Sequence, residues 1–217
     1  ALETGFGFCD VIVGTDIDDQ LCEGMDFTGW HSGYPDATLE VIPSSCRRIP
    51  YEPNSVMFLC QFAASHNQLC TRSILQKVVD RATEMGFKPL CALEFEFSLF
   101  ANNLSQCYQD NFATLQPLTP ANCGYSILRS STYADFYQQL LEFCEQMHMP
   151  LEGLHTEIGP GVLEAAIAYD QAIIAADKAA LFKTFTKVFA QRRDLMATFM
   201  AKWDKQQQGQ SGHTHIS

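Results

Sequence analysis

The sequence predicts an α+β protein in which a small β-rich N-terminal domain precedes antiparallel strands backed by three helices. Three observations support this class. Short apolar runs broken by Gly, Pro and Asp occur from residue 5 to about residue 62, and a strict period-two segment spans 91–100. Helical periodicity marks several longer segments, above all 70–86 and 170–194. With 47% hydrophobic residues in 217, the chain can bury a sizeable core. Disordered and fibrous classes are therefore excluded.

Charge and hydropathy limit the partners of the protein. The net charge is −11, from 14 Lys and Arg against 25 Asp and Glu, and it repels phosphate backbones and anionic lipid surfaces. The longest apolar stretch, 56–64, is interrupted by Gln61 and is far shorter than the roughly 20 residues that span a bilayer. No secretory signal opens the chain. We therefore expect no nucleic acid or membrane partner and a cytoplasmic location.

Cysteine usage and the chain ends add two expectations. The nine cysteines are odd in number, contain no CxxC pair and mostly lie in apolar contexts, which favours reduced core residues over a disulfide scaffold. The chain starts at Ala1 without an initiator Met and stops at Ser217 directly after an alternating polar segment. Both ends suggest part of a longer protein.

In the N-terminal part, the apolar runs 11–13 and 39–42 predict short strands, and residues 29–36 predict a turn-rich loop. From 70 to 86 the pattern changes to a helix that Gly86 ends. The residues that share its apolar face are Ile74, Leu75, Val78, Val79, Ala82 and Met85. This change predicts a boundary at 65–69. The two predicted domains are residues 1–65 and 66–217.

The next segments alternate strand and helix. Residues 91–100 alternate Phe and Leu with polar residues and predict a strand, and residues 101–129 predict a loop. Thr132 and Asp135 form a capping box that would start a helix. This helix must end before Pro150, because the residue preceding a proline avoids helical dihedrals.

The C-terminal segments follow the same logic. Residues 151–169 predict short strands around the turn Gly159-Pro160-Gly161. An Ala-rich helix is predicted for 170–194, and strands are predicted for 197–202 and 212–217. The positions expected to be buried in this helix include Ile173, Ala176, Ala180 and Val188.

Two carboxylates share one face of the strand 91–100. Side chains alternate across a strand, so Glu94 and Glu96 project from one face while Phe95 and Phe97 pack on the other. A solvated edge strand would explain the pair without any function. The flanking Phe, Leu and Cys residues instead favour a buried strand, where paired carboxylates need neutralisation. A divalent cation that binds both carboxylates would supply it.

Further candidate ligands lie near the turn and at the C-terminal strand. Glu157 and Glu164 flank the glycine turn, and His213 and His215 alternate on the last strand. Surface glutamates and a polar strand end are the ordinary explanations for each pair. Together the carboxylates and imidazoles predict an oxygen-rich site for Mg²⁺ or Mn²⁺. The histidines interpreted as packing or surface residues are His31, His66, His148 and His155.

Four motifs in this order resemble the glutamine synthetase family. They are Glu94-Phe95-Glu96-Phe97, His155-Thr156-Glu157 with the glycine turn and Glu164, Thr198-Phe199-Met200-Ala201-Lys202, and Ser211-Gly212-His213-Thr214-His215-Ile216-Ser217. The resemblance covers most of residues 34–217. The wording at Gly29-Trp30 and at Gly161 to Glu164 is similar to the branch of γ-glutamyl–amine ligases.

The resemblance implies roles for particular residues. It implies that Glu96, Glu157 and Glu164 hold one divalent ion, while Glu94 and His213 hold a second. It also implies catalytic roles for Glu157 and Tyr125, the latter on the amine-entry side. The positions implied for ATP are Glu152, Tyr169, His215 and Ser217, and Gly209 is the position implied for glutamate. Asp26 is the nearest candidate for an amine-deprotonating Asp supplied by a neighbouring subunit.

The resemblance further implies a ligase of nitrogen metabolism. ATP would phosphorylate glutamate to γ-glutamyl phosphate, and ammonia or a small amine would displace phosphate. The implied fold is a β-grasp-like domain followed by a truncated, barrel-like antiparallel catalytic domain, assembled in a homo-oligomeric ring. Family members are longer, so this chain would supply part of a site. Gln208-Gly209 replaces the usual Asn-Gly, and the sequence from Gly209 to Gly212 differs from the usual family motif.

Two other functions remain open at this point. A glutamine-synthetase-like structural protein, of the kind found in eye lens, would keep the fold and lose catalysis. The five metal ligands expected in this segment are all present, which favours the enzyme. An oxygen-rich metal hydrolase would bind cations without depending on a nucleotide.

Overall fold

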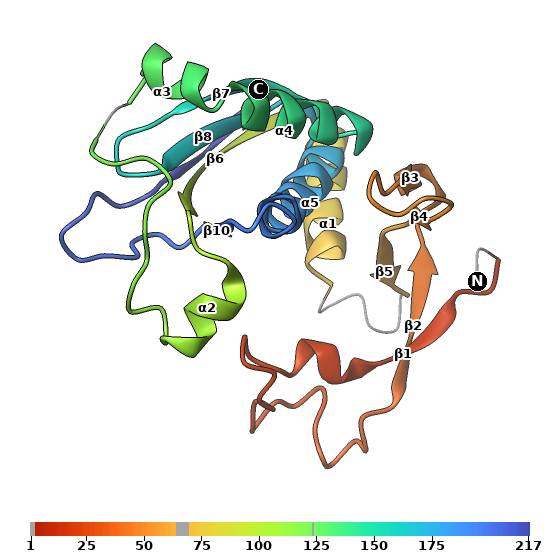
Figure 1. Ribbon diagram of the computed structural model, residues 1–217. Coiled ribbons are helices and arrows are strands. Elements are labelled where there is room, and N and C mark those ends of the chain that lie inside the picture. The colour runs from red at the N-terminus through yellow and green to blue at the C-terminus, as the bar shows by residue number, and fades with distance from the viewer. Residues whose placement is uncertain (1–2, 64–69, 123) are drawn as a thin grey trace. The chain divides into compact units, whose positions relative to one another are not determined.

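The computed structural model describes residues 3–63, 70–122 and 124–217, and contacts divide the chain into two compact units, 1–87 and 88–217 (Figure 1). This division falls between Phe87 and Lys88. The boundary expected at 65–69 lies outside the described residues.

The smaller unit contains a three-stranded antiparallel sheet in the order β1-β2-β5 and a two-stranded ribbon β3-β4. Ala37, Phe62 and Cys70 form a small buried cluster in this unit. The run 39–42 was predicted as a strand, and β2 confirms it. The strands are β1 (Phe6–Cys9), β2 (Asp36–Val41), β3 (Arg47–Arg48), β4 (Val56–Met57) and β5 (Cys60–Phe62).

The predicted strand at 11–13 is wrong, because Asp10–Val13 form a 3-10 helix. The side chain of Asp10 is buried and accepts a hydrogen bond of 2.7 Å from the Thr28 hydroxyl. A buried carboxylate needs a hydrogen-bond partner. Burial of Asp10 against Thr28 therefore favours the turn at residues 10–13 over an extended strand. A second 3-10 helix spans Pro43–Ser45. The predicted turn-rich loop 29–36 is confirmed up to β2.

The predicted helix 70–86 is confirmed as α1 (Thr71–Glu84). Its end agrees with the sequence, since Gly86 has φ of +90°, a left-handed conformation that glycine adopts readily. Several residues of its apolar side, including Ile74, Val78 and Met85, are exposed.

The larger unit is organised around β6 (Leu90–Phe100). Its antiparallel sheet has the order β10-β6-β8-β7, and β9 and β11 also pair with β6. Within the described residues this sheet stays open, so the expected barrel-like form is not confirmed. The other strands are β7 (Leu151–Thr156), β8 (Val162–Ile167), β9 (Asp170–Gln171), β10 (Met196–Thr198) and β11 (Gly212–Ile216).

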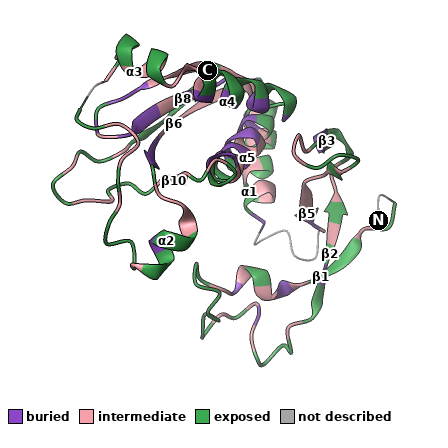
Figure 2. Ribbon diagram, in the orientation of Figure 1, coloured by how far each residue is buried: buried purple, intermediate pink, exposed green. Residues whose placement is uncertain are grey.

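The core of the larger unit lies on the odd-numbered face of β6. The rings of Phe95 and Phe97 pack against Phe182 of α5, with centroids 6.1 and 6.0 Å apart, and both rings also contact Phe199. The helix α5 (Ala172–Gln191) runs along this side, and Figure 2 shows the buried residues concentrated on α5 and β8.

The helix predicted at 170–194 is confirmed, but part of its predicted buried face is wrong. Ala180 is exposed, and Ile173, Ala176 and Val188 are only half-buried. Nearly every side of this helix is apolar, so the sequence does not fix which side faces the core. The apolar residues that the structure buries are Ala172, Ala175, Ala179, Leu181, Phe182, Phe189 and Ala190.

The predicted loop 101–129 is wrong in part, since it contains α2 (Leu104–Gln109) and the start of α3 (Ile127–Thr132). Each helix begins after a polar residue, Asn103 or Ser126, whose side-chain oxygen accepts a backbone N–H of the first turn. Such N-caps favour helix initiation. Asn103 and Ser126 are the residues from which the start of each helix could have been predicted.

The helix predicted before Pro150 is confirmed as α4 (Ala134–Gln146), but its predicted capping box is wrong. Thr132 closes α3, and its hydroxyl donates to the carbonyl of Leu128 at 2.8 Å. It therefore caps nothing in α4. The predicted strand at 197–202 is shorter than expected, because β10 ends at Thr198.

Candidate metal centre

The candidate centre lies on the even-numbered face of β6, opposite the aromatic core. Strand register places Glu96 of β6 across from Glu164 of β8, which in turn faces His155 of β7. On the other side of β6, Glu94 faces His213 of β11. Directly opposed residues have Cβ atoms about 4.5–5.5 Å apart, so the pairing gathers five ionisable side chains on one face.

One group of possible ligands joins Glu94, Glu164 and His213, whose ligand atoms lie within 4.8 Å of one another. His213 Nδ1 is 2.9 Å from Glu94 Oε2 and 4.0 Å from Glu164 Oε1. His215 Nε2 lies 3.3 Å from the same Glu94 oxygen. The carboxylate of Glu94 therefore lies between two imidazoles.

The charges of this first group stabilise one another. Hydrogen bonding to Glu94 raises the pKa of His213. Burial alone would raise the pKa of Glu94, but the hydrogen bonds from His213 and His215 outweigh burial and hold that pKa below its usual range. Glu94 is thus ionised and able to accept a cation.

A second group joins His155, Glu157 and Glu164, again within 4.8 Å. His155 Nε2 is 3.4 Å from Glu164 Oε2, and its Nδ1 is 3.9 Å from Glu157 Oε2. The Glu157 residue is only 8% exposed, and its Oε1 accepts the backbone N–H of Ile158 at 2.8 Å. Glu164 belongs to both groups.

His155, expected from the sequence to be a packing or surface residue, lies within the second group of possible ligands. A signal was available, because His155 and Glu157 are two residues apart at the end of a strand and so share a face. What the sequence did not show was the register of β7 against β8, which sets His155 opposite Glu164.

The donor set fits Mg²⁺ or Mn²⁺. Burial raises the pKa of Glu164, and the charges of Glu94 and the other nearby carboxylates raise it further, while His155 opposes them. In the described part of the chain, the ion pairs of Glu94, Glu157 and Glu164 are all with histidines. Carboxylate oxygens with imidazole nitrogens suit these cations, which would relieve the repulsion between the glutamates.

The grouping differs from the expected one in two respects. Glu157 and Glu164 lie together, as do Glu94 and His213, but Glu164 reaches both groups. Glu96, expected beside Glu157 and Glu164, faces Glu164 across the strands but lies outside both groups. Its two carboxylate oxygens accept hydrogen bonds from Ser211, at 3.0 Å from the backbone N–H and 2.7 Å from the hydroxyl.

Tyr125 lies beside the second group. Its ring stacks on His155 with centroids 4.8 Å apart, and its backbone N–H donates to the Thr156 carbonyl at 2.7 Å. Hydrogen bonding to Glu157 raises the pKa of the Tyr125 hydroxyl. Five other predicted site residues are exposed and lie outside both ligand groups. They are Glu152, Tyr169, Gly209, His215 and Ser217.

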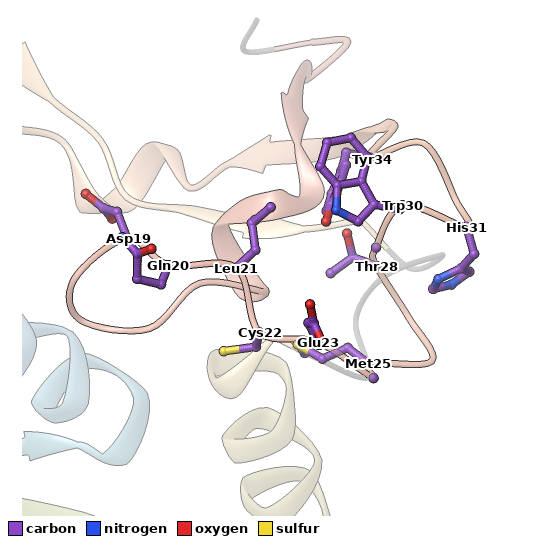
Figure 3. A pocket seen from close by; sticks show the side chains of 12 residues that line it. Asp19, Gln20, Leu21, Cys22, Glu23, Met25, Thr28, Trp30, His31 and Tyr34 are labelled. Carbon is purple, nitrogen blue, oxygen red and sulfur yellow. The ribbon is translucent and has the colours of Figure 1, made fainter.

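A separate cavity of about 530 Å³ lies in the smaller unit, within the loop that precedes β2 (Figure 3). Glu23, Trp30, His31 and Tyr34 contribute to its lining. The Trp30 and Tyr34 rings meet edge to face at 5.4 Å. Asp26, the nearest candidate for an amine-side acid, is exposed and is not among the lining residues.

Residues 68–217 match the sequence model of the family described as glutamine synthetase, catalytic domain. The chain belongs to the glutamine synthetase family. Type-1 glutamine synthetase 2 of Dictyostelium discoideum is 41% identical over 99% of this chain and 42% of its own length. Glutamate–isopropylamine ligase of a Pseudomonas species is 32% identical over 98% of this chain and 47% of its own length.

A solved structure with the same fold is the ligand-free form of GmaS. It has a TM-score of 0.79 at 20% identity and covers 99% of this chain and 47% of its own. The chain thus spans a little under half the length of these proteins. Among the described residues, no helix combines the length and apolar character needed to cross a membrane.

Proposed function

We propose that the protein takes part in the ATP-dependent ligation of ammonia or an organic amine to the γ-carboxylate of glutamate, through γ-glutamyl phosphate. One observation carries the proposal: Glu94, Glu157, Glu164 and His213 converge on one face of the β6 sheet in a member of the glutamine synthetase family. The relative named for isopropylamine supports an organic amine as the acceptor.

The two ligand groups would hold two Mg²⁺ or Mn²⁺ ions. Glu94, His213 and Glu164 would hold one, and Glu157 with Glu164, His155 and the neighbouring Glu96 would hold the other. Bound cations would supply charge neutralisation at the γ-phosphate of ATP while the glutamate γ-carboxylate attacks it. No protein nucleophile is needed for this chemistry.

Glu157 and Tyr125 would form the amine side of the site. The Ile158 N–H fixes Glu157 Oε1, so that Oε2 points toward His155. Interaction with the same carboxylate raises the pKa of the Tyr125 hydroxyl. An ammonium group would be attracted to this acidic face and would give up a proton to a carboxylate before attacking the acyl phosphate.

The remaining assignments rest on family resemblance. Gly209 would receive glutamate through its backbone, and we place the protein in the cytoplasm as a homo-oligomeric ring. The residues assigned to ATP are Glu152, Tyr169, His215 and Ser217.

Phosphate release by the protein tests this proposal. The assay contains ATP, glutamate and Mn²⁺ or Mg²⁺, with ammonia or each of a panel of amines. We expect release that requires glutamate and is stimulated by one acceptor, and its loss in Glu157→Gln. Glu142→Gln, which changes an exposed glutamate on α4, is the matched control.

Two results would overturn the proposal. A folded protein that binds Mn²⁺ but releases no phosphate would favour the catalytically inactive structural relative. Cation-dependent hydrolysis that needs no nucleotide would favour a metal hydrolase.

A further inference from the structure

The chain that follows β10 contacts the even-numbered face of β6 at four successive positions. Trp203 packs edge-on against Phe100 with ring centroids 4.9 Å apart, and the Gln210 side chain hydrogen bonds to the Ser98 hydroxyl. Ser211 bonds to Glu96, and His213 to Glu94. The β10–β11 loop (residues 199–211) is therefore attached to the same strand face that carries the metal ligands.

Ser211 and Glu96 are joined by three hydrogen bonds. The Glu96 backbone N–H donates to the Ser211 carbonyl at 3.1 Å, while the Ser211 N–H and hydroxyl donate to the two Glu96 carboxylate oxygens at 3.0 and 2.7 Å. These contacts fix both the position and the rotation of the carboxylate. Each carboxylate oxygen has two lone pairs, so this arrangement is compatible with binding a cation.

The Glu96 carboxylate needs such support because of its neighbour. Glu96 lies directly opposite Glu164, and like charges at opposed positions of a sheet repel each other. Donors from Ser211 offset part of that repulsion and hold Glu96 beside Glu164. A cation bound between the two carboxylates would strengthen the same arrangement.

The loop itself is closed immediately before Ser211. The Gln210 N–H donates to the Ala201 carbonyl at 2.7 Å, and Asp204 stabilises a turn at the tip through hydrogen bonds to the N–H groups of Gln206 and Gln207. Gly209, assigned above to glutamate, lies within this closed segment. A shift of the loop therefore moves Ser211, and with it the Glu96 carboxylate.

We propose that Ser211 is a positioning residue that couples order in the β10–β11 loop to cation binding at Glu96 and Glu164. The inference rests on the metal centre of the proposed function and adds to it a link between the cation and the loop that carries Gly209. Such a link is reciprocal: a bound cation orders the loop, and an ordered loop raises the affinity for the cation.

The first test measures Mn²⁺ affinity in the intact protein without nucleotide, from the electron paramagnetic resonance signal of free Mn²⁺. We expect Ser211→Ala to weaken binding by about 10-fold, as is typical when a residue that orients a metal ligand is lost. Ser211→Thr keeps the hydroxyl and should restore most of the affinity. Thr214→Ala, a hydroxyl removed from the adjacent strand at a position facing away from His213, is the control.

The second test measures loop order by limited digestion with trypsin at Lys202 and Lys205, with the exposed Arg48 of the smaller unit as the reference site. Mn²⁺ should slow cleavage at the two loop lysines in the wild type but not in Ser211→Ala. A general loss of stability would increase cleavage with and without Mn²⁺ and at all sites alike. Only coupling through Ser211 predicts that Mn²⁺ no longer slows cleavage of the loop in Ser211→Ala.

The outcomes separate this inference from the proposed function. A wild-type protein that binds no Mn²⁺ would overturn the metal centre, and this inference with it. A wild-type protein that binds Mn²⁺, alongside a Ser211→Ala variant with equal affinity and equal protection of the loop, would overturn the role of Ser211 alone.

Discussion

Glu164 belongs to both ligand groups, and this position lowers the stability of the cation-free protein. Burial and the surrounding carboxylates raise its pKa, which means that its ionised form is disfavoured in the folded state. A residue retained for binding commonly reduces stability in this way. One substitution can separate the effect of Glu164 on cation affinity from its effect on stability.

We expect Glu164→Gln to lower Mn²⁺ affinity at both groups while raising the melting temperature measured in EDTA. Glutamine keeps the size of the side chain but removes the charge that the fold disfavours at neutral pH. Calorimetric titration with Mn²⁺ and thermal unfolding in EDTA provide the two measurements. Unchanged Mn²⁺ affinity, or a lower melting temperature in EDTA, would contradict this view.

For single residues, the sequence predicted which side chains share a strand face better than it predicted which side chains lie next to one another across strands. Two carboxylates at alternate positions on an apolar strand indicated the face of Glu94 and Glu96 correctly. The sharing of Glu164 and the inclusion of His155 depend on register across three strands, which no local pattern encodes. Ser211 was visible only as a departure from the family wording.

Among the elements, β9 and α5 are joined by a largely buried ion pair. Lys178 Nζ lies 2.7 Å from Asp170 Oδ2, and Lys178 is only 8% exposed. Asp170→Asn would leave a buried ammonium without its counter-charge, and we expect it to destabilise the larger unit by about 1–3 kcal/mol. Urea unfolding followed by circular dichroism measures this loss.

A second substitution serves as the control for that measurement. Adding Lys178→Met to Asp170→Asn removes the unpaired charge and should recover most of the stability. Additive losses in the double variant would show that the pair does not link β9 to α5.

The same pair predicts how stability depends on pH. Burial would raise the pKa of Asp170, but hydrogen bonds from Lys178 and the Gln171 N–H outweigh burial and lower it. A lowered folded-state pKa contributes stability above the unfolded value of about 3.9, and this contribution is lost as pH falls through the folded value. Below about pH 4 the unfolding free energy of the wild type should therefore fall more steeply than that of Asp170→Asn. Parallel acid titrations of both proteins check this, and equal slopes would refute it.

Elements with strong periodicity were predicted well, and short ones were not. The period-two segment became β6, and the helical segments became α1, α4 and α5. The apolar run 11–13 formed a 3-10 helix because Asp10 is buried against Thr28, a contact 18 residues away in sequence. Tertiary contacts of this kind override short local patterns.

At the scale of the whole molecule, the two units bury unequal cores. The described cluster of the smaller unit consists of Ala37, Phe62 and Cys70, whereas the larger unit buries several phenylalanines. Because buried apolar area sets much of the local stability, we expect amide hydrogens of β2 to exchange faster than those of β6. Hydrogen exchange with mass spectrometry measures both, and equal protection would indicate a single cooperative unit.

The overall architecture was predictable only in class. The sequence indicated an α+β protein with antiparallel strands, and the structure agrees. The barrel-like form came from resemblance to longer proteins, while the described residues form an open sheet. The chain spans a little under half the length of the relatives it matches.

The attachment of residues 203–213 along one face of β6 places a constraint on chain length. Inserting or deleting one residue between Trp203 and His213 would shift β11 by one position, and because strand side chains alternate, both imidazoles would turn to the opposite side of the sheet. Such a change could abolish the centre without altering a single ligand. Natural variants of this protein should therefore tolerate substitutions at Gln206, Gln207 and Gln208 far better than any change in their number.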